Sequence, residues 1–518
     1  MESAAPSAAA LDTRDYERRW WTLAVLCVSL VLIVVANASL NVALPTLVRD
    51  LHAGASSLQW IVDAYSLVFA GLLLTAGALG DRYGRRLALN GGLIVFGAAS
   101  GIAAFSNSAS ALIAARAAMG VGAAFVMPAT LSVLAHVFPP DERPKAIAIW
   151  AAFAGVGAAL GGVTSGWLLQ HFWWGSIFLT NVFVVAVALV AGFFLIPSAN
   201  ERRRAPLDPL GALLSIAGLG ALIYGIIEAP NRGWMSPSTL ATFGITVVIL
   251  SAFAAWEFRA KDPMLDLRFF RNPRFTAGAT TITLIFFVMF GSFFVITQYL
   301  QSVLGYTPLE AGIRVLPWAA VYMVSTTRSA GLVVRFGQRR VVSTGLLIVA
   351  AGLVVLSRST VHTSYAWVAL GLMITAAGMG MTTAPSTGAI MQSLPLPKAG
   401  VGSAVNDTTR EVGGALGVAV FGSILTSRFH AVVTDRISGL PADAGHSLGA
   451  ALQRAATLPG PRGAAVADAA RHAYVQGFDT TLLVAATVAV LASGLIAWLL
   501  RPNVPATAEQ AVVELEAA

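Results

Sequence analysis

The sequence predicts an all-α protein that crosses a membrane many times, and three features of its composition support this. Of its 518 residues, 57% are hydrophobic and 11% charged, whereas soluble proteins carry roughly 25% charge. Apolar runs of about 20 residues recur, each long enough to cross a hydrocarbon core of ~30 Å. The 49 glycines suit helices that pack closely in lipid. Most of the protein surface is therefore expected to face lipid rather than water.

Span length and flanking charge predict about fourteen membrane helices in three groups. Six are expected at residues 21–44, 58–79, 87–105, 110–133, 145–169 and 174–196. Two follow at 208–228 and 238–258, and six more at 275–303, 310–333, 341–357, 365–391, 401–427 and 479–500.

This grouping divides the chain into two bundles separated by an insertion. We expect an N-terminal tail at 1–20, a six-helix bundle at 21–196, a two-helix insertion with flanking loops at 197–274, a second six-helix bundle at 275–500 and a C-terminal tail at 501–518. One long external loop is expected at about 429–478, with short surface helices around 447–456 and 464–474. Duplicated six-span halves are typical of transporters that bind substrate near the membrane midplane.

The distribution of basic residues predicts the orientation of the chain. The net charge is +8, and the arginines and lysines gather in every second inter-helix loop, including 82–86, 143–145, 202–204, 259–274 and 335–340. Such loops face the cytoplasm in membrane proteins. We therefore expect both termini on the cytoplasmic side of a plasma membrane, the inner membrane of a bacterium. The positive charge is an orientation signal and does not indicate nucleic-acid binding.

Residue types that form metal and nucleotide sites are sparse. Cys27 is the only cysteine, which excludes an intramolecular disulfide, and the seven histidines show no metal-ligand spacing. No Walker-type loop marks an ATP site. The sequence therefore predicts no catalytic residue, metal or cofactor. A transport cycle would draw its energy from a proton gradient.

The most specific motif lies between the second and third expected spans, at residues 77–86. One acid, three arginines and three glycines in this segment require a short, tightly turned loop on one face of the bilayer. Asp81 can pair with an arginine or cap a helix start, and residues 335–340 repeat the pattern loosely. The candidate gating residues are Gly77, Asp81, Arg82, Gly84, Arg85 and Arg86.

This pattern, G-x-L-x-D-R-x-G-R-R, resembles the loop between the second and third helices of the major facilitator superfamily of transporters. The order of six, two and six spans resembles the fourteen-span drug:proton antiporter branch, which contains multidrug efflux pumps. The resemblance covers residues 20–500. It implies the major facilitator fold, two six-helix bundles with two extra helices between them, and transport by alternating access.

Two motifs in the fourth and fifth spans carry the same resemblance. Arg116 matches the superfamily's L-x-x-x-R-x-x-x-G motif, whose arginine is linked to proton transfer; an arginine that only bonds to carbonyls is the alternative. The antiporter motif, which implies export, is matched in part, because Gly162 stands where relatives carry proline. The candidate residues of this motif are Gly157, Gly161, Gly162 and Gly166.

The position of the proton-carrying acid is open. Asp63 lies in a W-x-x-D-x-Y pattern of the second span that resembles the fourteen-span branch. Asp407 lies one turn before both Arg410 and Glu411 in the thirteenth span, where a local ion pair is the alternative. For proton coupling we rank Asp63 with Arg116 first and Asp407 with Arg410 second.

Polar and aromatic side chains in the first, second and ninth spans are candidates for substrate binding. The first span ends in an NVALP element similar to that of the fourteen-span branch, but Ala36 stands where relatives commonly carry Asp. Rings in the ninth span can form a wall for a hydrophobic, flat or cationic drug, although packing between helices is their commoner role. The candidates are Asn37, Asn41, Tyr65, Phe290, Phe294 and Gln298.

The sequence therefore predicts a secondary transporter that exports hydrophobic or amphipathic small molecules, such as drugs or antibiotics, in exchange for protons. Its expected partners are a hydrophobic or cationic substrate, protons and the lipid bilayer, and it is expected to be a monomer. The alternative is a dedicated exporter of one metabolite, lipid or self-made antibiotic, which the missing acid at Ala36 favours slightly. A channel or sensor that has lost transport would lack the gating loop and Arg116, and both are intact.

Overall fold

The computed structural model describes residues 13–51, 55–197, 208–261, 263–436, 448–458 and 461–500, and in these ranges the chain is helical without strands. The first six helices are α1 (Thr13–Leu51), α2 (Ala55–Tyr83), α3 (Arg85–Ala104), α4 (Ala109–Val137), α5 (Arg143–His171) and α6 (Ser176–Leu195). A hairpin follows, α7 (Pro209–Arg232) and α8 (Pro237–Arg259). The last group is α9 (Pro273–Gln298), α10 (Pro308–Phe336), α11 (Gln338–Ser357), α12 (Tyr365–Gln392), α13 (Ala399–Arg436), α14 (Leu448–Thr457) and α15 (Pro461–Leu499).

Thirteen helices of the described ranges are long and apolar enough to cross a membrane, one fewer than the sequence predicts. The difference is α10, which coincides with the span expected at 310–333 but carries Arg314 and Arg328 within its length. These charges lower its hydropathy. Each of the other expected spans coincides with an apolar helix, and the all-α, many-span fold class is confirmed.

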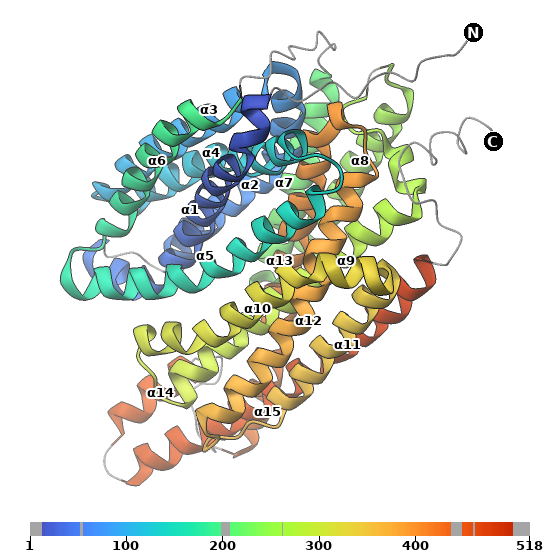
Figure 1. The fold of residues 1–518 in the computed structure, drawn as a ribbon. Helices are drawn as coiled ribbons and strands as arrows, with labels where there is room; N and C mark the ends of the chain where they lie inside the picture. Colours follow the sequence, from blue (N-terminus) through green and yellow to red (C-terminus); the bar gives the residue numbers. More distant parts are fainter. Residues whose placement is uncertain are drawn as a thin grey trace, which may run out of the picture.

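Two hydrophobic cores divide the helices into two groups. Helices α1–α6 pack around a core that contains Leu26, Phe96 and Phe178. Helices α9–α13 and α15 pack around a second core, in which Tyr299 stacks on Phe478 at 4.7 Å. Figure 1 shows the blue and teal helices of the first group on one side of the molecule and the yellow to red helices of the second group on the other.

The α7–α8 hairpin covers the seam between the two groups. Trp60 of α2 stacks on Tyr224 of α7 with ring centroids 6.2 Å apart, and the Thr75 and Ser215 hydroxyls lie 3.4 Å apart. Beyond α7, Trp234 Nε1 donates to Ser423 Oγ of α13 at 2.9 Å. Because α2 and α13 belong to different groups, the hairpin contacts both of them along the line where they meet.

The segment 429–478 is more helical than expected. Helix α13 continues to Arg436, α14 coincides with the short helix expected around 447–456, and the helix expected around 464–474 is the start of α15, which begins at Pro461. Alanines at 464, 465, 467, 469 and 470 have the highest helix propensity, so α15 extends well before its apolar span. Buried Tyr474 donates to the Val295 carbonyl at 2.8 Å, which fixes this extension to α9. Residues 437–447 and 459–460, and the expected tail at 501–518, lie outside the described ranges.

The two copies of the loop motif form the same turn. Gly84 joins α2 to α3 with φ +109°, and Gly337 joins α10 to α11 with φ +80°. Only glycine adopts this conformation without strain, so the loose repeat in sequence is a repeat in structure. We call the end of the bundle that carries these two turns the basic end, after its arginines Arg82, Arg85, Arg86, Arg335, Arg339 and Arg340.

Candidate transport site

At the basic end, Asp81 joins the two helix groups. Its Oδ1 accepts from the Gly400 backbone N–H at 3.0 Å and its Oδ2 from the Val401 N–H at 3.1 Å. These are orphan donors of the first turn of α13, where a negative charge is also favoured by the helix dipole. Arg85 pairs with Asp81 at 3.3 Å and donates to the Leu396 carbonyl at 2.8 Å. Both roles expected for Asp81, helix cap and arginine partner, are therefore present.

Two glycines make this contact possible. A Cβ on Gly77 would lie 2.5 Å from the Gly400 carbonyl oxygen, and one on Gly400 would lie 2.7 Å from the Asp81 carboxylate. The Gly400 carbonyl is backbone, and the Asp81 carboxylate caps α13. Neither group can therefore move without separating α2 from α13. Arg86 reaches within its own group and donates to the Phe193 carbonyl at 2.7 Å. Arg82 stacks on Tyr83 at 5.3 Å.

The glycines of the antiporter motif on α5 face two different helices. A Cβ on Gly157 or Gly161 would lie 3.1 or 2.6 Å from side chains of α1. Gly162 lies against Gly312 of α10, and Gly166 lies against Leu309, with added Cβ distances of 3.6 and 3.3 Å. Gly157 and Gly161 therefore pack within the first helix group, whereas Gly162 and Gly166 pack across the interface between the two groups.

Arg116 is fully buried between α4 and α2. Its Nε donates to the Ile61 carbonyl at 3.0 Å, and its guanidinium lies 4.4 Å from the centroid of the Tyr65 ring. Both terminal nitrogens, and the Tyr65 hydroxyl, have no hydrogen-bond partner among the described residues. Arg116 and the half-buried Asp63, ranked first for proton coupling, therefore do not form a hydrogen-bonded pair.

The second pair, Asp407 and Arg410, lies at the centre of the interface. Their side chains are buried and their nearest atoms, Oδ1 and Nη1, are 3.5 Å apart. The ion pair considered as the alternative is present, yet it is incomplete, because Asp407 Oδ2 has no hydrogen-bond partner among the described residues. Asn406 donates to Asp407 at 3.2 Å and accepts from Thr387 at 2.9 Å.

Arg410 also stands between aromatic rings from both helix groups. Its guanidinium carbon is 5.5 Å from the Trp150 ring of α5 and 4.5 Å from the Phe286 ring of α9. A cation over an aromatic face is attracted by the ring quadrupole, most strongly where water is excluded. Trp150 is itself held by a 3.2 Å hydrogen bond from its Nε1 to Thr130. Arg410 thus lies on α13 of the second group, and its guanidinium is close to rings of both groups.

Further ionisable side chains lie near this centre. The Tyr65 ring lies 4.4 Å from the Arg116 guanidinium, and Glu411 of α13 is within electrostatic range of Tyr65. Glu411 is also within electrostatic range of Arg410 and Asp407. We call Arg116, Tyr65, Glu411, Arg410 and Asp407 the central cluster. It spans both helix groups and holds two carboxyl groups, each of which can exist ionised or protonated.

The substrate candidates fall in different environments. Tyr65 is buried in the central cluster, and Asn37 is half-buried on α1. Phe290 and Phe294 are partly exposed on α9, where they border the glycines of α13, and Gln298 donates to the Phe294 carbonyl at 3.4 Å. The side chain of Asn41 lies outside the described residues.

Sequence reasoning missed the rings around Arg410. Trp150 is separated from it by about half of the chain, and no motif marks this tryptophan. Phe286 sits among many other aromatic residues of its span, and no motif marks Tyr322, which interacts electrostatically with Arg410. Glu411 is visible in the sequence beside Asp407 and Arg410, but in this segment proton coupling was assigned only to those two residues, although Glu411 lies one helical turn after Asp407 and shares its face.

The comparison with protein families identifies the family to which the chain belongs. The model of the Major Facilitator Superfamily matches residues 26–418. The chain belongs to this superfamily. It is a family of transporters rather than an enzyme class, so this superfamily member is a multi-pass membrane transporter of small molecules.

Three relatives match this superfamily member over most of their length. The multidrug efflux pump LfrA of Mycolicibacterium smegmatis is 35% identical over 489 residues, covering 93% of this chain and 97% of that protein. The methyl viologen resistance protein SmvA of Salmonella typhimurium is 36% identical, with 92% and 97% covered. The tetracenomycin C resistance and export protein of Streptomyces glaucescens is 31% identical, with 92% and 90% covered. The expected relationship to drug efflux pumps is confirmed.

Solved structures of superfamily members share the fold at low identity. The bacterial homolog to the human lysosomal transporter Spinster superposes with a TM-score of 0.57 at 19% identity, covering 93% of this chain and 98% of that one. The proton:xylose symporter XylE superposes with a TM-score of 0.59 at 14% identity, covering 94% and 97%. These likenesses extend to the fold alone.

Proposed function

We propose that the protein exports hydrophobic or amphipathic drugs and antibiotics across the plasma membrane in exchange for protons. The observation that carries this proposal is its similarity, along more than nine tenths of the chain, to efflux and resistance proteins. The basic loops face the cytoplasm in this proposal, in keeping with the positive-inside rule. Both termini then lie in the cytoplasm, and the protein acts as a monomer.

The central cluster suits proton coupling. An ionised carboxyl group at Asp407 or Glu411 is stabilised by Arg410, and protonation frees the guanidinium for its aromatic neighbours. Since those neighbours belong to both helix groups, the protonation state of α13 changes how strongly the groups hold together. Arg116 on α4 and Tyr65 on α2 extend the central cluster into the first helix group. Substrate binding can change the electrostatic interactions of these two side chains as well.

The contact at Asp81 suits a cytoplasmic gate. In the conformation described here, Asp81 and Arg85 hold α13 against α2 at the basic end, which closes that side. To open this side, the two hydrogen bonds from the backbone of α13 to Asp81 must break, together with the hydrogen bond from Arg85 to the Leu396 carbonyl. Bonds to a charged group contribute about 1.5–3 kcal/mol each, so substrate and proton binding must supply a comparable difference between the two states.

The partly exposed rings of Phe290 and Phe294 on α9 suit a hydrophobic cation. Phe290 lies 5.8 Å from the ring of Phe286, which is buried against Arg410, and Phe294 follows Phe290 one turn later. A row of rings binds many flat molecules without a fixed hydrogen-bond pattern. This accounts for a broad substrate range without requiring an acid at Ala36.

A transport assay in inside-out vesicles tests the proposal. With an acidic lumen, wild-type protein should accumulate cationic dyes, and a protonophore should abolish the accumulation. Arg116→Ala should lose gradient-driven uptake while still binding dye in part, because the arginine lies outside the aromatic surface. Undiminished proton-driven uptake by Arg116→Ala would make that arginine structural. No uptake of any dye by well-folded wild-type protein would sink the multidrug proposal.

The second candidate is a dedicated exporter of a single metabolite, lipid or self-made antibiotic. The observation that favours it is Ala36, which leaves α1 without the acid that would attract cations. Two relatives are resistance proteins for single antibiotics, tetracenomycin C and methylenomycin A. Transport of one uncharged or anionic compound, with no response to dyes, is the result that selects this candidate.

A further inference from the structure

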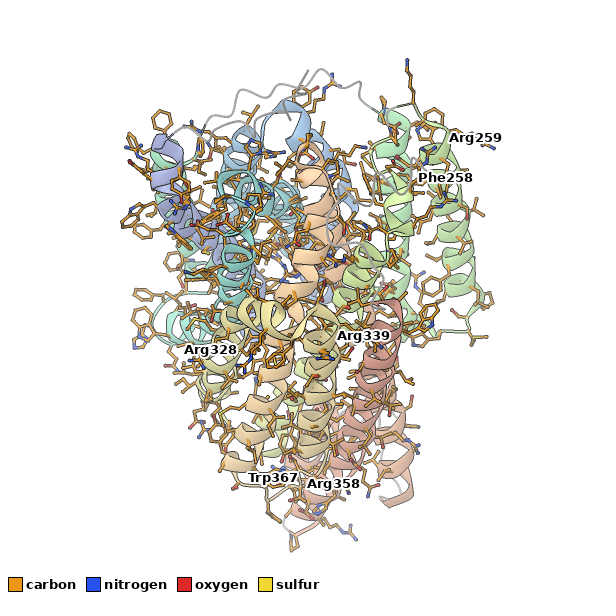
Figure 2. All side chains as sticks on the ribbon, turned by 45° about the vertical axis from the view of Figure 1, so that its right-hand side comes forward. Phe258, Arg259, Arg328, Arg339, Arg358 and Trp367 are labelled. Atoms are coloured by element: carbon orange, nitrogen blue, oxygen red, sulfur yellow. The ribbon has the colours of Figure 1, made fainter. Side chains whose placement is uncertain are left out.

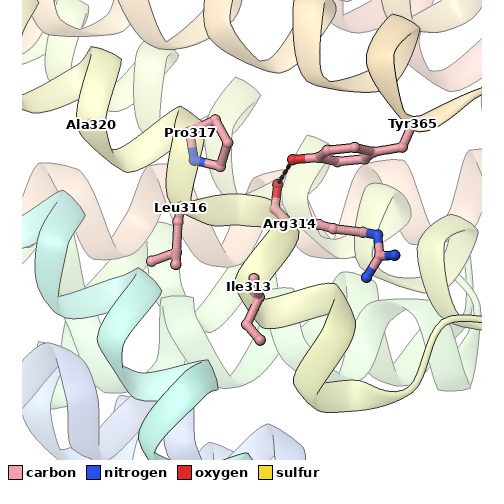
Figure 3. A pocket seen from close by; sticks show the side chains of 6 residues that line it. All are labelled: Ile313, Arg314, Leu316, Pro317, Ala320 and Tyr365. Carbon is pink, nitrogen blue, oxygen red and sulfur yellow. Dashed lines mark hydrogen bonds between the residues drawn. The ribbon is translucent and has the colours of Figure 1, made fainter.

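One side of α10 carries an apolar groove with an arginine near each end. Two hollows of about 590 and 410 Å³ meet at Ala320. Figure 3 shows the first, lined by Ile313, Arg314, Leu316, Pro317, Ala320 and Tyr365. The second continues past Val321 and Val324 to Arg328. We call the two hollows together the α10 groove.

The Arg328 half of the α10 groove faces away from the first helix group. Leu309 and Gly312 of α10 meet Gly166 and Gly162 of α5, which defines the side of the helix that lies in the interface. At 100° per residue, Val321, Val324 and Arg328 point about 120–180° away from Gly312, whereas Leu316 points only about 40° away from it. The Arg328 half of the groove therefore opens toward the lipid, and its Leu316 wall borders the interface. Its floor is α12, where Ser325 Oγ approaches the Ala376 carbonyl at 3.3 Å.

The two arginines of the groove differ in their surroundings. Arg314 is satisfied, because its guanidinium lies 3.7 Å from the Tyr306 ring and 5.5 Å from the Tyr365 ring. Arg328 is exposed, and no side chain or carbonyl of the described residues pairs with it. It lies eight residues before the end of α10, roughly 12 Å along the axis from Phe336. A lone guanidinium at that depth is unfavourable in hydrocarbon unless an anion joins it.

We propose that the α10 groove binds an anionic phospholipid of the leaflet at the basic end, with its phosphate at Arg328 and an acyl chain along the groove. The length fits, since the twelve residues from Arg328 back to Leu316 rise roughly 18 Å, close to half of a ~30 Å hydrocarbon core. The charge fits as well. Arg335 and Arg339 follow at the basic end, and basic pockets on that side attract anionic headgroups. Figure 2 shows Arg328 and Arg339 at a similar level, with Arg358 toward the other end.

Competing occupants fit less well. A hydrophobic cation, the substrate class proposed above, would be repelled by Arg328. A free phosphate ion would satisfy Arg328 but would leave Val321, Val324 and Leu316 uncovered. An anionic lipid places its phosphate at Arg328 and covers the apolar residues of the groove with an acyl chain. The proposal does not depend on what the protein transports.

The test uses full-length protein in detergent. Its melting temperature is measured with phosphatidylglycerol, phosphatidylcholine or short-chain glycerophosphate, and retained lipids are counted by native mass spectrometry. We expect phosphatidylglycerol to raise the melting temperature of the wild type and of Arg358→Gln, a matched exposed arginine outside the groove. Arg328→Gln should lose at least half of that rise and one retained lipid.

A second variant separates the groove from the charge. Val324→Trp fills the groove, and its side chain is 44% exposed in the wild type, so folding should survive. Loss of the retained phosphatidylglycerol in Val324→Trp supports the proposal even if Arg328→Gln fails to fold. An unchanged phosphatidylglycerol effect in both variants overturns it. An equal rise from glycerophosphate would assign the site to a phosphate ion and would also overturn it.

Discussion

At the scale of single residues, Asp81 is the clearest example of a side chain whose charge holds two distant segments together. It is 319 residues away from the Gly400 N–H that it caps, and both partners lie at the ends of helices that belong to different groups. An ionised carboxylate in this position satisfies two orphan donors of α13 and pairs with Arg85. No single-residue replacement reproduces all three contacts, because only Asp combines this length with a full charge.

Asp81→Asn should therefore impair transport without unfolding the protein. Asparagine keeps one acceptor oxygen but turns an N–H₂ group toward a backbone donor of α13, and it loses the pair with Arg85. Loss of one bond to a charged group corresponds to roughly a tenfold or greater effect. The measurement is gradient-driven transport per folded protein. Asp141→Asn, an exposed acid at the same end, is the control and should transport normally; normal transport by Asp81→Asn would contradict the gate.

Arg410 shows the same principle at the centre of the molecule. Its charge is shared between Asp407 and two rings, and the 3.5 Å separation from Asp407 leaves the ion pair loose. A loose pair is easier to exchange for a proton than a tight one with two parallel hydrogen bonds. Arg410 therefore allows Asp407 to change its charge while remaining in a buried position.

At the scale of elements, the contact between α9 and α13 depends on bare backbone. A Cβ on Gly417 would lie 2.1 Å from the Phe287 carbonyl oxygen, and one on Gly413 would lie 2.3 Å from the Thr283 carbonyl oxygen. Small residues let helices approach closely where no hydrophobic effect drives them together. The position of the central cluster relative to Phe286 is set by this approach.

Gly417→Ala should push α13 away from α9 and destabilise the protein by about 1–3 kcal/mol, the range for overpacking. The matched control is Gly494→Ala in α15, where an added Cβ meets nothing within 4 Å and the higher helix propensity of alanine applies. Melting temperatures of the two variants in the same detergent check this. Equal melting temperatures for the two variants would show that the helix contact adjusts freely.

A surface ion pair links α1 to the start of α5 at the basic end. Arg19 donates to both carboxylate oxygens of Glu142, at 2.7 and 3.1 Å, and this hydrogen bonding lowers the pKa of Glu142 below its ordinary value. A lowered pKa in the folded state stabilises the protein above the ordinary carboxyl range, and that stabilisation is lost as the pH falls through the lowered pKa. The contribution is modest, because the pair is accessible to water.

Glu142→Gln should therefore melt slightly below the wild type near neutral pH. The difference should shrink at about pH 3, which is below the usual glutamate pKa of about 4.3, and it should disappear below the lowered pKa of the folded state. Thermal melts at the two pH values provide the measurement. A difference that persists in acid would mean that Glu142 acts through packing rather than charge.

Apolar length made the helices predictable, whereas their partners were not. A run of about 20 apolar residues has few alternatives in a membrane, so the spans coincide with the helices. Hydropathy could not locate the extension of α15, because alanine-rich turns outside the membrane form helix through local propensity. The sequence predicted that Asp81 can cap a helix. It did not predict that the capped residues are Gly400 and Val401, since nothing in the sequence pairs these two segments. The same holds for Trp150 beside Arg410.

At the scale of the whole molecule, three of the contacts between the two helix groups, among the described residues, involve the sites discussed above. Asp81 joins them at the basic end, Arg410 joins them at the centre, and the glycine row of α5 meets α10 through Gly162 and Gly312. The α7–α8 hairpin covers the seam between α2 and α13. In the alternating access proposed above, the contact at Asp81 breaks, and we expect the charge state of the central cluster to be coupled to this opening.

The most direct test of this coupling measures protons and substrate together in proteoliposomes that contain only the purified protein and a trapped pH-sensitive dye. Addition of a transported cationic compound to wild-type vesicles should drive protons in the opposite direction. Asp407→Asn combined with Glu411→Gln should abolish the proton movement, whereas exchange of labelled for unlabelled compound continues. Proton movement at the wild-type rate in this double variant would contradict the assignment of proton coupling to the central cluster.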